Sequence, residues 1–144
     1  MGSAVAAGPA VSEAADVVDA VARHRIANLL NSYTDIADRK DLDAVVDLLG
    51  GARVQFPHRS YSSPDAAHGF FADLWAGPTG HRHDTSNLRV FPGDAERWNA
   101  HAHYTRWIFD PEPVLHTLGE YTLEIDAADW SIRALTVTRT WTKG

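Results

Sequence analysis

The sequence predicts an α+β fold in which three N-terminal helices pack on one face of a strongly curved, antiparallel or mixed sheet. Two observations support this prediction. Up to about residue 75, apolar residues recur every three or four positions, as they do on the buried side of a helix. Later segments are rich in β-branched and aromatic residues and are joined by short turns, which favour antiparallel hairpins. A bent sheet covered by helices forms a cone-shaped α+β barrel, whose cavity commonly holds a small molecule.

The composition is that of an ordinary globular protein, since 44% of the 144 residues are hydrophobic and 22% are charged. We predict a flexible leader over residues 1–12 and a single domain over residues 13–144. The net charge of −6 argues against nucleic acid as a partner, because binding phosphates requires a dense cationic surface. No run of about 20 apolar residues is present, which argues against a membrane partner. The absence of cysteine excludes disulfides and fits a cytoplasmic protein.

The first helix is predicted from about residue 11 to residue 38, because its apolar residues form one stripe. The members of this stripe are Val18, Ala22, Ile26, Leu29 or Leu30, Tyr33 and Ala37. A second, short helix is predicted over residues 41–49, with Asp41 as its N-cap. The third helix falls within residues 62–75, with Ser63 in the N-cap position.

Five strands are expected, one between the helices and four after them. They comprise residues 52–56, 86–91, 97–109, 114–125 and 131–141. One face of the long strand 97–109 carries His101, His103, Thr105 and Trp107, and the other carries Ala100, Ala102, Tyr104 and Arg106. The sequence does not decide which face lines the cavity, because one β-bulge would exchange them. We favour the face of Tyr104 for substrate binding and keep His103 and Trp107 as candidates.

The segment "HRHDTSN", residues 81–87, allows three interpretations. The chain contains two H-x-H pairs, His81 with His83 and His101 with His103. Two such pairs on neighbouring strands would have the spacing of a metal site, but Asp84 would face away from His83 on a regular strand, so we expect no metal. In the second interpretation, one histidine is a general acid/base oriented by Asp38 at the end of the first helix. In the third, the segment is only the polar start of a strand.

The run "YTDIADRKDLDAVVDLL", followed by a short strand, a helix and "HDTSNLRV", resembles the nuclear transport factor 2-like superfamily. Within that superfamily the chain is most similar to the SnoaL-like group of polyketide cyclases, scytalone dehydratase and bile-acid dehydratases. The resemblance spans about residues 17–141 and includes "GEY" and the final "TVTRTW". It implies a homodimer and an enzyme that needs no cofactor.

The resemblance also implies roles for individual residues. Asp38 matches the family's catalytic aspartate, and His83 matches its catalytic strand histidine. Tyr33 matches a cavity tyrosine, whereas Phe56 stands where scytalone dehydratase has a water-binding tyrosine. His81 lies outside the motif and is expected at the rim or on the surface. A further tyrosine, Tyr121 of "GEY", lines the pocket or belongs to the core.

These observations predict a cofactor-independent acid/base enzyme, namely a cyclase, dehydratase or isomerase. Its expected substrate is a small, apolar, oxygenated molecule such as a polyketide intermediate. Elimination of water, double-bond migration and ring closure all use a base beside a carbonyl group. Two alternatives remain open: a non-catalytic binding module of the same fold, and an epoxide hydrolase, which would favour an Asp-Arg-Asp cluster.

Overall fold

The computed structural model describes the backbone of residues 2–144 and the side chains of residues 13–144. Its helices are α1 (Gly2–Arg39), α2 (Leu42–Leu49) and α3 (Pro64–Leu74). Its strands are β1 (Arg53–Gln55), β2 (Ser60–Tyr61), β3 (His81–Pro92), β4 (Arg97–Phe109), β5 (Pro113–Asp126) and β6 (Ser131–Thr142). The flexibility predicted for residues 1–12 concerns residues whose side chains are not described, and it stays a prediction.

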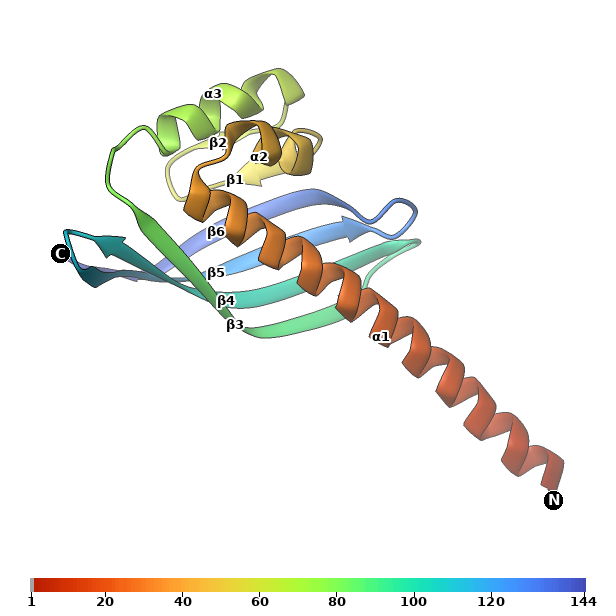
Figure 1. Ribbon diagram of the computed structural model, residues 1–144. Helices are drawn as coiled ribbons and strands as arrows, with labels where there is room; N and C mark the ends of the chain where they lie inside the picture. Colours follow the sequence, from red (N-terminus) through yellow and green to blue (C-terminus); the bar gives the residue numbers. More distant parts are fainter. Residues whose placement is uncertain (1) are drawn as a thin grey trace.

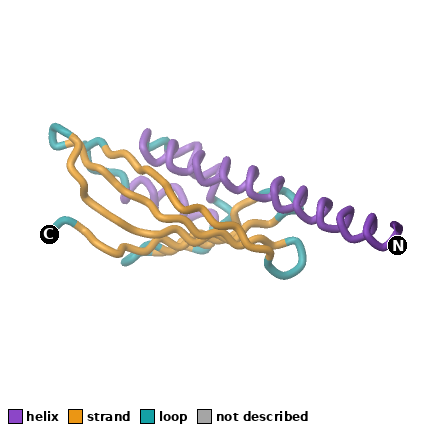
Figure 2. The backbone as a smooth tube through the Cα atoms, turned by 90° about the horizontal axis from the view of Figure 1, so that it is seen from below, coloured by secondary structure: helices purple, strands orange, loops and turns teal. Residues whose placement is uncertain are grey.

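The strands form one mixed sheet in the order β2-β1-β6-β5-β4-β3. β1 runs parallel to β6, and the other neighbouring strands are antiparallel. The helices cover one side of this curved sheet, and α1 crosses the sheet and extends past it towards the N-terminus (Figure 1). The strands lie together as one layer beneath α1 when the molecule is turned (Figure 2). The α+β cone is therefore confirmed, with a sheet whose two edges do not meet.

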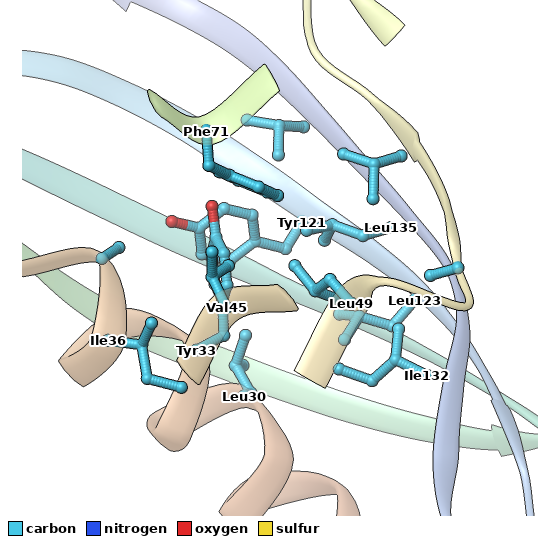
Figure 3. Packing of buried hydrophobic residues seen from close by; sticks show 14 of the residues in the cluster. Leu30, Tyr33, Ile36, Val45, Leu49, Phe71, Tyr121, Leu123, Ile132 and Leu135 are labelled. Atoms are coloured by element: carbon cyan, nitrogen blue, oxygen red, sulfur yellow. The ribbon is translucent and has the colours of Figure 1, made fainter. Parts of the chain in front are cut away.

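The interior of the cone is filled by side chains from both layers (Figure 3). The apolar stripe of α1 is buried from Ala22 onward, whereas Val18 is 57% exposed where the helix runs past the sheet. From α2 and α3, Leu49 and Phe71 are fully buried. Each such side chain contributes about 1.5–3 kcal/mol by leaving water. None of the described helices combines the length and apolar character needed to cross a membrane.

The local sequence signals hold at some ends of these elements and fail at others. The Asp41 side chain accepts a hydrogen bond from the backbone N–H of Ala44 at 3.1 Å, which confirms the predicted N-cap of α2. Ser63 occupies the N-cap position of α3, but its side chain makes no cap hydrogen bond. β3 begins at His81 rather than at residue 86, so the whole "HRHDTSN" segment is part of a strand.

Contacts between the end of α1 and the start of β3 bring distant residues together. Lys40 ends α1 with a left-handed backbone (φ 53°). Its ammonium group donates to the backbone oxygens of Gly77 and Thr79 at 2.6 and 2.8 Å, just before β3. The backbone N–H of His83 donates to Asp38 Oδ1 at 2.8 Å, across 45 residues of chain. The helix end is thereby fixed against the first residues of the strand.

Candidate functional site

A cavity of about 200 Å³ lies between the helices and the concave face of the sheet. Its apolar wall is formed by Phe56, Leu74, Trp75 and Val137. Its polar wall includes His81, His83, Arg106 and Arg139, together with Tyr33, Tyr104 and Tyr121. An apolar wall combined with a few converging polar groups is the usual composition of a small-molecule site.

His83, on the wall of this cavity, forms a hydrogen-bonded pair with Asp38. His83 Nδ1 lies 2.8 Å from Asp38 Oδ1, the same oxygen that accepts the His83 backbone N–H. Because an ionised carboxylate only accepts hydrogen bonds, Nδ1 carries a proton, and in the neutral form of the imidazole Nε2 therefore keeps its lone pair. The His83 side chain is only 9% exposed, and Nε2 makes no hydrogen bond to a described residue. The pair therefore presents an unprotonated nitrogen to the cavity.

His81 is not at the rim or on the surface, as the sequence suggested, but is buried (6% exposed) in the cavity wall. Its Nε2 donates to the backbone oxygen of Ala37 at 2.5 Å, and its Nδ1 accepts from Arg106 Nε at 3.2 Å. Burial and the nearby positive groups lower the pKa of His81 to about 4. His81 is therefore a neutral imidazole at pH 7, and both of its nitrogens are in use.

Three tyrosines form the floor of the cavity beside His83. The rings of Tyr104 and Tyr121 are stacked with centroids 4.4 Å apart, and Tyr33 meets Tyr121 edge to face at 5.7 Å. Figure 3 shows Tyr33 rising from α1 towards Tyr121 on the sheet. Burial raises the pKa of all three phenols, so each keeps its proton at neutral pH and can donate a hydrogen bond.

Gly119 makes room for this stack. It lies opposite Tyr104 in the sheet, and a Cβ added at Gly119 would lie 2.3 Å from the Tyr104 ring and 2.3 Å from the Thr138 backbone oxygen. The glycine of "GEY" is therefore required by close packing against the ring.

Arg106 reaches the cavity from the Tyr104 face of β4, and Arg139 reaches it from β6. Arg106 Nε donates to His81, and its Nη1 lies 3.4 Å from His116 Nδ1. Burial, followed by neighbouring positive charges, lowers the pKa of His116, so that partner is neutral as well. Because imidazoles rather than carboxylates bind Arg106, the Asp-Arg-Asp cluster of an epoxide hydrolase is not formed around it.

The two candidates on the opposite face of β4 lie away from the cavity. His103 is exposed and lies near Asn87, and the Trp107 indole donates to Asp84 at 3.2 Å. Neither belongs to the cavity wall, whereas Phe56 does. The register between β4 and β5 shifts after Arg106 because β5 carries an extra residue there, His116, so β4 keeps its alternation and holds Tyr104 and Arg106 on the inner face.

Two clusters of described side chains bring possible metal ligands within 4.8 Å of one another. In the cavity these are Asp38, His81 and His83, and on the outer face of the sheet they are His101, His103 and Glu120. In the cavity cluster, a metal would displace the proton that His81 shares with Ala37 and would lie close to the Arg106 guanidinium. This donor set therefore fits an acid/base pair better than a cation site.

No protein-family model and no curated protein matches the sequence. Solved structures do match. A candidate scytalone dehydratase from Novosphingobium aromaticivorans is similar over 87% of this chain and 88% of its own, with 16% identity and a TM-score of 0.74. A hexachlorocyclohexane dehydrochlorinase from Novosphingobium barchaimii is similar over 89% and 92%, with 17% identity and a TM-score of 0.75.

The β subunit of a candidate aromatic-ring-hydroxylating dioxygenase, also from Novosphingobium aromaticivorans, is similar over 88% of this chain and 94% of its own. Its identity is 16% and its TM-score is 0.74. Enzymes and an enzyme subunit thus share the arrangement of helices and sheet described above, at identities that establish the fold alone. The chain has the α+β cone fold of these structures, which is the fold expected from its resemblance to the nuclear transport factor 2-like proteins.

Proposed function

We propose that this protein is a cofactor-independent acid/base enzyme that removes a proton from a carbon next to a carbonyl group of a small molecule. The observation that carries the proposal is the pair formed by His83 and Asp38, which presents a free imidazole nitrogen to the cavity. A base positioned in this way contributes about 10²–10⁴ to the rate of proton transfer.

In the proposed reaction, His83 Nε2 takes the proton, and the electron pair of the C–H bond moves into the carbonyl to form an enolate. Asp38 stabilises the imidazolium that results. The hydroxyl of Tyr104 or Tyr121 donates to the enolate oxygen, which is possible because both phenols keep their protons. Return of the proton to another carbon completes an isomerisation. Its transfer to a departing hydroxyl group releases water and completes a dehydration.

The similarity in fold supports an elimination among these outcomes. A dehydratase removes water and a dehydrochlorinase removes hydrogen chloride, and both steps begin with a base beside a leaving group. The homodimer, the cytoplasmic location and the polyketide class of substrate stay predictions from the sequence.

The test is solvent deuterium incorporation into a panel of small ketones, keto acids and hydroxy acids in D₂O, followed by proton NMR. We expect wild type to exchange at least one member of the panel and His83→Gln to lose about 10²-fold or more of that rate. His68→Gln, which changes an exposed histidine of α3, is the matched control and should exchange as wild type does. Exchange that persists in His83→Gln, or that is absent from wild type, would contradict the proposal.

A further inference from the structure

The two arginines in the cavity, Arg106 and Arg139, form no ion pair with a described acidic residue. None of the ion pairs between described residues includes Arg106 or Arg139. The hydrogen-bond partners of Arg106, His81 and His116, are both uncharged at neutral pH for the reasons given above. No described carboxylate lines the cavity, and Asp38, which lies next to it, is bound to His83. The arginine side of the cavity therefore carries an uncompensated positive charge.

This arrangement is costly unless something else supplies the negative charge. Arg106 is half-buried, and burial lowers the pKa of its guanidinium because it disfavours the charged form. Arg139 adds a second positive charge that acts on the same group. A charge removed from water is normally paired, and a guanidinium binds a carboxylate through two parallel hydrogen bonds. Nε and Nη1 of Arg106 are in use, which leaves Nη2 and the Arg139 guanidinium for a ligand.

We propose that the cavity binds an anionic substrate, a compact carboxylate with an apolar body, whose carboxylate is held by Arg106 and Arg139. The binding part of this inference stands on the two arginines alone. It rests on the proposed function only in placing the reacting carbon against His83, whose register partner on β4 is Arg106.

The size of the cavity limits the apolar body. A cavity of ~150 Å³ lined by apolar side chains holds one benzene molecule, and the volume here is about 200 Å³. A single ring that bears a carboxylate therefore fills it. Phe56, Val137 and Arg139 also line a shallower groove along β6, so a larger substrate has room to extend past the arginine.

Calorimetric titration with benzoate and benzamide tests this inference without turnover. The two probes have the same ring and nearly the same shape, but only benzoate is charged. We expect benzoate to bind at least tenfold more tightly than benzamide at low ionic strength, and this preference to shrink as salt is added. Equal affinity for the two probes, or no detectable binding of benzoate at millimolar concentration, would overturn the inference.

Three variants assign the preference to the arginines. Arg106→Gln should lose most of it, and Arg106→Lys should retain part because the charge stays. Arg139→Gln lies at the exposed side of the cavity, so it tests the same point without disturbing the core. Arg133→Gln, which changes an exposed arginine outside the cavity, is the control and should bind as wild type does. A benzoate preference that survives both cavity substitutions to Gln would also overturn the inference.

His83→Gln separates this inference from the proposed function. If both hold, His83→Gln keeps the preference for benzoate over benzamide and no longer catalyses deuterium exchange. If benzoate binds selectively but wild type exchanges nothing, the anion site stands and the acid/base function fails. If wild type exchanges uncharged ketones and ignores benzoate, the function stands and the anion site fails.

Discussion

The neutral state of His81 makes the stability of this protein depend on pH in a way that can be calculated. The pKa of His81 is about 4 in the folded protein and 6.5 in an unfolded chain. Protonating the folded residue would place a proton between Nδ1 and the Arg106 guanidinium, which now donates to that nitrogen at 3.2 Å. The unfolded chain therefore binds a proton first as the pH falls. This contribution to stability is complete above pH 6.5 and is lost as the pH falls towards 4.

The size of the effect follows from the two pKa values. Linkage gives a loss of about 2 kcal/mol between pH 7 and pH 5, and about 3 kcal/mol between pH 7 and pH 4. The assay is urea denaturation of wild type and of His81→Gln at these pH values, because glutamine does not titrate. Other ionisable groups are common to both proteins, so wild type should lose about 3 kcal/mol more than the variant between pH 7 and pH 4. Equal losses in the two proteins would contradict this prediction, since they would mean that folding leaves the titration of His81 unchanged.

Three further predictions concern single substitutions. Asp38→Asn should keep the fold, because the amide oxygen can still accept the His83 backbone N–H. It should lower the deuterium-exchange rate by about 10²-fold or more. An unchanged rate would show that Asp38 has no part in the mechanism. Gly119→Ala should destabilise the protein by about 1–3 kcal/mol in urea denaturation, because the added Cβ would clash with both the Tyr104 ring and a backbone oxygen. An unchanged free energy of unfolding would show that this packing is loose. Tyr61→Phe should lower the free energy of unfolding by about 0.5–1.5 kcal/mol, because it removes the 2.7 Å hydrogen bond from the Tyr61 hydroxyl to the Leu49 backbone oxygen. Thr138→Ala, which removes a hydroxyl at an exposed site on β6, is the matched control.

The regular elements of this fold were predictable because each has a strong local signal. The hairpin strands β4, β5 and β6 were placed to within one residue at either end, since turn residues separate long β-branched and aromatic runs. The start of β3 was missed because "HRHDTSN" is polar and has few residues that favour strands. Contacts with the end of α1 specify that segment as a strand, and local propensity does not report such contacts.

In the site, too, residues with a local sequence signal could be predicted, and residues that depend on tertiary contacts could not. The pairing of Asp38 with His83 could be expected from the family resemblance, and the structure shows a hydrogen bond between them. The burial of His81 in the cavity wall was not predicted, because it depends on the contact with Arg106 and on packing that the sequence does not encode locally. The alternation of β4 offered one signal for Arg106, since it shares a face with Tyr104. The choice of the Tyr104 face for substrate binding therefore also placed Arg106 in the cavity. The sequence could not show that Arg106 has no carboxylate partner among the described residues, because this depends on the tertiary structure.

The proposed function depends on the hydrogen bond by which Asp38 orients His83, so that the free Nε2 faces the cavity. Long-range proton–nitrogen NMR of histidine side chains labelled with ¹⁵N reports which nitrogen carries the proton, and it needs no substrate. At a pH where His83 is neutral, we predict a proton on Nδ1 and a lone pair on Nε2, and a shift away from that tautomer in Asp38→Asn. A proton on Nε2 in wild type, or the same mixture of tautomers in both proteins, would contradict it.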